Sequence, residues 1–313
     1  MRGCLRQCLV AAFILASAFA QQPDTSAPST SAPLGSESPP LSLELDASGA
    51  VPQSQMRALL LRVAENDLQN FRQERDYTYI RRQEERRLDS HGRVEKKESQ
   101  TSEIFQLYGE QVGRLIKKDD MPLTDAEASN EEAKIQKLID RRRQESEDDR
   151  RKRLEKEEKD QEEDRKFVLE VADAFNFRLA GSELLHGRDT WVLDAEPRPG
   201  YQPQRREAKM LSKFQGRIWI DKDELQWVKV DLTAIENLSF GWIVARIQKG
   251  THIHVEQIRV NEEVWLPQYV QFHVDARIAL LKSLRMDVEQ TYQDYKKFRT
   301  DTKVTVIGNA GEQ

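Results

Sequence analysis

Three histidines in the C-terminal half are the residues of this sequence best placed for metal chemistry. His252 and His254 are two positions apart in a segment of strand-like alternation, so they share one face, and Glu256 comes next on it. If residues 261–263 form a hairpin turn, His273 lies across from His252. Two or three imidazoles with a carboxylate are a plausible zinc set. The alternative, which we favour, is that these histidines only line the wetter face of an otherwise apolar strand, so we expect no metal site.

Motifs that carry enzymatic chemistry are absent from the rest of the sequence. It has no nucleophile-elbow Gly-x-Ser-x-Gly, no His-Glu-x-x-His and no phosphate-binding glycine loop. The abundant carboxylates of residues 141–166 are expected in water, where nothing shifts their pKa values. We therefore expect no catalytic residue, no cofactor and no enzymatic activity.

The N-terminus has the pattern of a secretory signal over residues 1–20. Arg2 and Arg6 precede an apolar run, and Ala18-Phe19-Ala20 fits a small-x-small cleavage site. The run of about a dozen residues is too short to span a bilayer, which takes about twenty. Cleavage would release the chain into the periplasm or the medium. A retained anchor is the alternative, and lipid attachment at Cys8 is disfavoured because the preceding residues are bulky and charged.

Cysteine usage and charge restrict the partners. Both cysteines, Cys4 and Cys8, lie in the predicted signal, and an exported chain without disulfides suits a bacterial cell envelope. Removing Arg2 and Arg6 from 49 basic residues leaves 47 against 54 acidic ones, a net charge of −7. This balance gives no reason to expect nucleic acid or an anionic membrane as partner. We also expect no transmembrane segment in the mature chain.

Residues 21–54 are rich in Pro, Ser, Thr and Ala and predict a disordered linker. A helix is expected from about Ser54 to Arg72, because apolar residues recur there at helical spacing. The stripe consists of Leu60, Val63, Ala64, Leu68 and Phe71.

Strands follow within residues 55–123. Residues 77–88 and 93–109 flank the polar turn Asp89-Ser90-His91-Gly92 and predict a β-hairpin. A further short strand is expected over about 111–117. These elements form the N-terminal part of the fold.

Residues 124–180 predict one long charged helix. Thr124 and Glu127 have the spacing of a capping box, and no glycine or proline follows until Gly181. Residues 141–166 hold eleven basic and eleven acidic residues, which excludes a cationic arm for nucleic acid. Acids repeatedly stand four residues before bases, the order that stabilises a helix. The spacing lacks the apolar heptads of a coiled coil, and disorder is the remaining alternative.

Residues 181–308 predict an antiparallel sheet with one apolar face. Apolar and polar residues alternate there in a series of short segments separated by polar turns. The alternation places eight side chains on one face of neighbouring strands, and we take them as candidates for binding an apolar ligand: Ile218, Ile220, Val228, Val230, Ile253, Val255, Phe272 and Val274. Helical stripes at residues 60–71 and 168–175 are available to cover this face.

Three segments of the C-terminal half resemble a known family. They are Gly216-Arg217-Ile218-Trp219-Ile220-Asp221, Val264-Trp265-Leu266-Pro267 and Tyr292-Gln293-Asp294-Tyr295-Lys296-Lys297-Phe298. They are similar to segments of the lipoprotein-carrier superfamily, the LolA/LolB-like half-barrels, and especially of exported bacterial proteins labelled outer-membrane lipoprotein-sorting proteins. The resemblance covers about residues 185–300. It implies an α+β fold in which helices cover a curved antiparallel half-barrel sheet that can hold acyl chains. The long charged helix, inserted between two groups of strands, departs from the basic carrier.

Three functions are compatible with these observations. The first is a non-enzymatic periplasmic protein that binds lipid or lipoprotein acyl chains in the half-barrel. The second is an envelope structural or regulatory module that meets a protein partner through the charged helix. The third, a metal-dependent enzyme, is the weakest. We expect the first, and the step from fold to ligand rests on resemblance.

Overall fold

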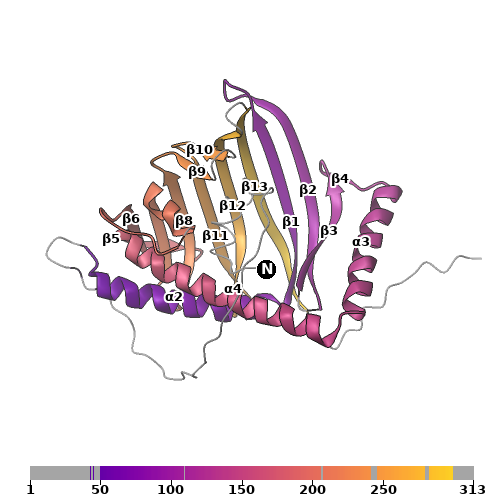
Figure 1. Cartoon of the computed structure of the whole chain (residues 1–313), viewed down its shortest axis with the longest axis horizontal. Coiled ribbons are helices and arrows are strands. Elements are labelled where there is room, and N and C mark those ends of the chain that lie inside the picture. Colours follow the sequence, from indigo (N-terminus) through magenta and orange to yellow (C-terminus); the bar gives the residue numbers. More distant parts are fainter. Residues whose placement is uncertain are drawn as a thin grey trace, which may run out of the picture.

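One antiparallel sheet runs through the folded chain (Figure 1). The structure is a computed structural model, and it describes residues 43, 45, 50–108, 110–205, 207–240, 245–278 and 282–298. The predicted signal, residues 1–20, lies outside the described residues, as does most of the predicted linker.

The N-terminal strands are β1 (Tyr77–Leu88), β2 (Val94–Leu107), β3 (Glu110–Lys118) and β4 (Met121–Pro122). The strands after the helical insertion are β5 (Phe175–Leu185), β6 (Arg188–Pro197), β7 (Phe214–Asp221), β8 (Trp227–Ala234), β9 (Leu238–Phe240), β10 (Ala245–Ile247), β11 (His252–Val260), β12 (Val264–Ile278) and β13 (Lys282–Lys297). Their order across the sheet is β4-β3-β2-β1-β13-β12-β11-β8-β7-β6-β5, with β10 pairing β9 and β12. In the described chain β4 and β5 form the two ends and do not pair with each other, so the sheet stays open.

The last strand joins the two groups of strands. Strand β13 pairs with β12 on one side and with β1 on the other. Segments almost two hundred residues apart therefore form one sheet. The predicted α+β half-barrel with helical material inserted between two groups of strands is confirmed.

The hairpin of β1 and β2 forms where its sequence predicts it. Asp89 accepts from the His91 and Arg93 N–H groups at 2.8 and 3.0 Å. Gly92 has a φ of +77°, a left-handed conformation that glycine adopts without steric cost.

Helix α2 (Gln53–Glu74) and helix α4 (Glu147–Ala174) lie side by side across one face of the sheet (Figure 1). Two contacts join them: the Gln53 amide donates to the Ala172 carbonyl, and Arg57 pairs with Asp173. Their buried residues and those of the sheet form one apolar core, which draws on every strand from β5 to β13. None of the described helices is long and apolar enough to cross a membrane.

The prediction of one uninterrupted charged helix is wrong at residues 144–146. Helix α3 (Asp125–Arg143) ends there, and α4 begins in a different direction (Figure 1). Ser146 caps α4 by accepting from the Asp149 N–H at 3.1 Å. Glu145 binds Arg153 through both oxygens, at 3.0 and 2.9 Å, and Arg142 at 3.0 Å. Cap and ion pairs together fix an elbow. The predicted capping box of Thr124 and Glu127 is present at the start of α3.

The helical insertion is also shorter than the predicted 124–180. Helix α4 ends at Ala174, and β5 starts at Phe175. Phe175 and Phe177 are buried while Asn176 is exposed. From this point buried and exposed side chains alternate with the two-residue period of a strand and no longer follow the 3.6-residue period of a helix. Residue 50 forms a bridge with Arg178, and the Val51 N–H donates to the Phe177 carbonyl at 3.2 Å. The end of the predicted linker is therefore attached to the edge of β5.

Candidate functional site

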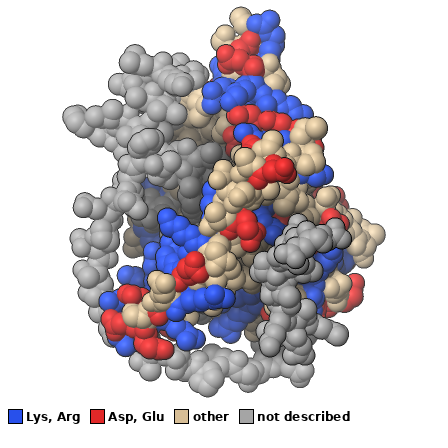
Figure 2. Space-filling view, turned by 90° about the vertical axis from the view of Figure 1, so that its right-hand side faces the viewer, with Lys and Arg blue, Asp and Glu red and all other residues tan. Residues whose placement is uncertain are grey.

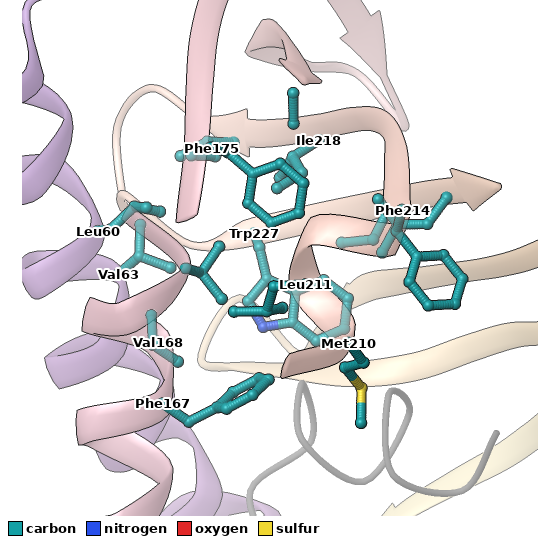
Figure 3. Close-up of a pocket in the computed structure, with 15 residues that line it drawn as sticks. Leu60, Val63, Phe167, Val168, Phe175, Met210, Leu211, Phe214, Ile218 and Trp227 are labelled. Atoms are coloured by element: carbon teal, nitrogen blue, oxygen red, sulfur yellow. The ribbon is translucent and has the colours of Figure 1, made fainter. Parts of the chain in front are cut away.

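A small apolar cavity lies between the sheet and the helices (Figure 3). Its volume is about 50 Å³. The short 3₁₀-helix η1 (Glu207–Lys213) closes it from the side. All lining residues are apolar: Leu60 and Val63 of α2; Phe167, Val168 and Val171 of α4; Phe175 of β5; Ala195 of β6; Met210 and Leu211 of η1; Phe214, Ile218 and Ile220 of β7; and Trp227, Val230 and Leu232 of β8. The helical stripes expected to cover the sheet therefore do cover it.

The eight predicted ligand-binding residues fall into three groups. Ile218, Ile220 and Val230 line the cavity. Four others are buried in the same apolar core beyond the cavity wall: Ile253, Val255, Phe272 and Val274. Val228 is buried but belongs to neither set.

A β-bulge explains the position of Val228. Trp219 pairs with Lys229 and Ile220 pairs with Trp227, so Val228 is the extra residue between them. A bulge breaks the strict alternation on which the prediction rests. Trp227 takes the expected place of Val228 in the cavity wall. Its indole N–H donates to Asp67 of α2 at 3.0 Å, which fixes the ring under the helix.

Helix α2 is anchored to the sheet by a buried amide. Asn70 accepts from the Trp265 N–H and donates to the Trp265 carbonyl, both at 2.6 Å. The Asn70 side chain thus takes the place of a neighbouring strand for the backbone N–H and C=O of Trp265, which would otherwise lose these hydrogen bonds. The tryptophan of the segment 264–267 therefore serves to dock the helix that covers the cavity.

The described residues between β6 and β7, 198–205 and 207–213, form a lid that the sequence patterns did not reveal. It carries η1, whose Met210 and Leu211 close the cavity (Figure 3). Of the fifteen lining residues, Met210 and Ile218 are the two that are not fully buried. The cavity therefore comes closest to solvent between η1 and β7. Methionine is flexible and adapts its shape to a variable neighbour.

Polar contacts latch this lid to α4. Glu170, which is buried, accepts from the Tyr201 hydroxyl at 2.7 Å and from the Gln204 N–H at 2.6 Å. Arg205 pairs with Glu163 at 2.6 Å and lies 3.5 Å from Glu170. Since Glu163 and Glu170 are seven residues apart, the two carboxylates share one face of α4.

The ionisation states suit this latch. Burial raises the pKa of Tyr201, and the neighbouring Glu170 carboxylate raises it further, so the hydroxyl stays a donor. Burial opposes ionisation of Glu163, but the positive charges of Arg205 and Lys166 outweigh it and hold its pKa below the ordinary value. The latch is charged at neutral pH.

The three candidate metal ligands face carboxylates. His252 does lie across from His273, as predicted. Each imidazole contacts an acid of its own: His252 Nε2 is 2.8 Å from Asp231 Oδ1, and His273 Nδ1 is 2.6 Å from Asp287 Oδ1.

His254 lies between two acids, with Nδ1 at 3.0 Å from Asp231 and Nε2 at 3.0 Å from Glu256. No group of three His, Cys, Asp or Glu side chains suited to a metal occurs among the described residues. Ile253, on the opposite face of the strand, is buried. The histidines thus belong to hydrogen-bonding contacts with carboxylates on the polar face of the sheet.

No family model matches this sequence, and no curated protein matches it significantly. Solved structures do. One is a putative outer membrane lipoprotein-sorting protein domain from Vibrio parahaemolyticus, with 10% identity, 78% of this chain and 95% of that chain covered, and a TM-score of 0.31. Another is a DUF1329 family protein from Desulfovibrio piger, with 11% identity, 80% and 95% coverage, and a TM-score of 0.26.

A third is a LolA superfamily protein from Nitrosomonas europaea, with 9% identity, 78% and 93% coverage, and a TM-score of 0.25. The first description names a lipoprotein-sorting domain, and the third names the LolA superfamily. These superpositions are too loose to transfer a ligand, a partner or a residue's role to this chain.

Proposed function

We propose that this protein binds one apolar ligand, an acyl chain of a lipid or lipoprotein, in the cavity under the lid. It does so without catalysis, in the periplasm, after removal of residues 1–20. The observation that carries the proposal is a cavity lined only by apolar side chains and closed by a lid that polar contacts hold.

The size of the cavity requires that the lid moves. Its volume of about 50 Å³ is far below the roughly 300–1,000 Å³ of ordinary ligand sites. An acyl chain therefore enters only if η1 and the rest of the lid move away from the sheet. The polar latch lies on α4 outside the apolar lining, so opening it transfers charged groups to water and not into the core.

The energies of this exchange are of the same size. Burying about ten methylenes contributes about 8 kcal/mol, at about 0.8 kcal/mol each. Each hydrogen bond that the latch makes to a carboxylate contributes about 1.5–3 kcal/mol. The bound chain can thus offset the loss of the contacts made by Tyr201, Gln204 and Arg205.

Titration with a fluorescent fatty acid tests the proposal. We expect saturable binding near one equivalent, competed by phospholipid or lipopeptide. Mass spectrometry of lipids extracted from the purified mature protein identifies a natural ligand. A folded protein with a cooperative melt and no saturable binding would contradict the proposal and leave the sheet as a scaffold.

Variants of the latch sharpen this test. Glu170→Gln weakens the contacts of residue 170 with Tyr201 and Arg205, so the association rate of the fatty acid should rise. The dissociation rate should change little, because the apolar contacts that determine it stay the same. Arg178→Ala is the control, because Arg178 is an exposed residue of β5 whose ion pair is with Asp194 of β6 and not with the lid. Equal association rates in both variants would show that the lid does not control entry.

A further inference from the structure

The outer edge of strand β3 is covered by a helix and not by another strand. Of its nine residues, only Lys117 and Lys118 pair with β4, which leaves seven without a strand partner on that side in the described chain. Helix α3 stands beside this edge (Figure 1). The Leu115 N–H points out of the sheet and donates to Glu131 of α3 at 3.4 Å. Gly113 and Gln111, which precede Leu115 by two and four residues, present their N–H groups to the same side of the strand.

Helix α3 meets this edge with hydrogen bonds and ion pairs, and its apolar residues Ile135, Leu138 and Ile139 are only partly buried. None of its residues is buried. Glu127 lies 3.8 Å from Lys118, and Glu132 lies 3.9 Å from Arg114. All four of these side chains are more than 40% exposed, and ion pairs at such positions stabilise little. By contrast, α2 and α4 bury apolar residues in the core.

The charges on the two elements are complementary. Arg114 and Lys118 of β3 each contact a glutamate of α3, Glu132 and Glu127 respectively, and Arg114 also pairs with Glu103 of β2. Figure 2 shows this side of the molecule, where basic and acidic side chains are mixed. Glu131 supplies a carboxylate where a neighbouring strand would supply a carbonyl.

We propose that an acidic, extended peptide of a partner protein adds to β3 as a further strand. Helix α3 covers the edge to which this peptide would pair, and it moves away when the peptide binds. Strand addition would satisfy the outward N–H and C=O groups of residues 110–116. Acidic side chains on the peptide would lie opposite Arg114, where α3 now places Glu132. Because α3 buries no residue, its displacement at the elbow of residues 144–146 would break the contact between Arg142 and Glu145 but leave the apolar core in place.

This inference goes beyond lipid binding and rests on different residues. The cavity lies between β5–β8 and the helices α2 and α4, whereas β3 is at the other end of the sheet order. Loss of one activity therefore leaves the other intact.

Peptide binding to the full mature chain tests it. The probe is a fluorescent seven-residue peptide of alternating Glu and Val, and a Lys/Val peptide of the same length is its control. Glu131→Ala frees the Leu115 N–H and loosens α3, so we expect the acidic peptide to bind about tenfold more tightly than to wild type. Glu155→Ala, on an exposed position of α4, should bind like wild type.

Hydrogen exchange locates the bound peptide. The amides of residues 111, 113 and 115 should gain protection when the acidic peptide binds. If Glu131→Ala does not free the edge, the double variant Glu127→Ala/Glu132→Ala is used. It removes the ion pairs of α3 with Lys118 and Arg114. A thermal melt confirms that each variant folds.

Three results would overturn the proposal. The first is equal affinity for the acidic peptide in wild type and both α3 variants, and the second is binding without protection of β3. The third is dimerisation of the α3 variants through β3, which would assign the edge to a second copy of the chain.

Discussion

The two halves of this sheet are stabilised in different ways. Around β6–β8 and β11–β12 one face is apolar and packs under α2 and α4. Across β13 and β1 the same face becomes polar: the Tyr292 hydroxyl donates to Gln290, Gln290 to Gln83, and Gln83 to Glu85, at 2.6 to 2.7 Å. One continuous sheet thus combines a hydrophobic core with a hydrogen-bonded and charged extension. The half with the core holds the apolar cavity, and the other half holds the β3 edge.

A buried carboxylate is the centre of the polar half. Glu84 is 4% exposed and contacts Arg82 at 2.7 Å, Arg86 at 2.5 Å and Lys97 at 3.1 Å. Burial opposes its ionisation, but these three cations prevail and lower its pKa to about 2. Strands β1 and β2 are therefore joined by charge where the other half uses apolar packing.

The largest expected effect is loss of core packing in the apolar half. Ile220→Ala removes a fully buried side chain of the cavity wall and should cost about 2–5 kcal/mol of unfolding free energy. Val94→Ala, at a 54% exposed position in the polar half, should stay within about 0.5 kcal/mol. Urea denaturation measures both, and similar losses would mean that the two halves do not differ as described.

Glu84→Gln tests the polar half. It leaves three cations around a neutral group and should cost about 1.5–3 kcal/mol at pH 7. Because the native pKa of Glu84 lies below its ordinary value, its stabilising effect is full above about pH 4.5 and disappears as the pH falls toward 2. The difference between wild type and Glu84→Gln should therefore shrink in that window. A difference that is constant from pH 7 to pH 3 would exclude the ion-pair explanation.

Two glycines, Gly216 on β7 in the apolar half and Gly113 on β3 in the polar half, test how tightly the chain packs around each strand. A Cβ on Gly216 would lie 2.0 Å from the Asp231 carbonyl oxygen of the neighbouring strand, so Gly216→Ala should cost about 1–3 kcal/mol. A Cβ on Gly113 would meet the flexible end of Ile104 at 3.2 Å, and Gly113→Ala should cost less. Thermal melts rank the two variants, and the reverse order would show that β7 and β8 can separate easily.

The smallest effect concerns the elbow between the helices. Ser146→Ala removes the N-cap of α4 and should lower stability by about 0.5–2 kcal/mol. Asp125→Ala, which leaves the cap of α3 in place, is the control. If Ser146 is not the cap, the variant should melt like the control.

Periodic patterns predicted most of this architecture because they report which face of an element is buried. The hairpin, the alternation in β7, β8 and β11–β13, and the stripes of α2 and α4 follow from such patterns. The patterns failed where the determining interaction is local or tertiary. Ser146 caps a helix inside a run of charges that otherwise favours continuous helix, and the bulge at Val228 shifts the face by one residue.

The remaining misses have related causes. Strand β5 follows α4 with no glycine or proline between them, so no breaker marks the change at Phe175. The lid carries no long apolar period, and its position depends on Glu170 and Glu163 of α4, far away in sequence. At the candidate site, the sequence therefore identified the sheet and the covering helices, and not the element that closes the cavity.

Filling the cavity is the most direct test of the central claim that an acyl chain binds between β6–β8 and the helices. Ala195→Leu adds three carbons to a buried lining residue, about the size of the present cavity. A fluorescent fatty-acid titration of this variant should show affinity reduced by at least about tenfold, which is about 1.4 kcal/mol, with a melt close to that of wild type. Leu184→Ala, at a 70% exposed position of β5, should bind normally. Unchanged affinity in a folded Ala195→Leu protein would contradict the account.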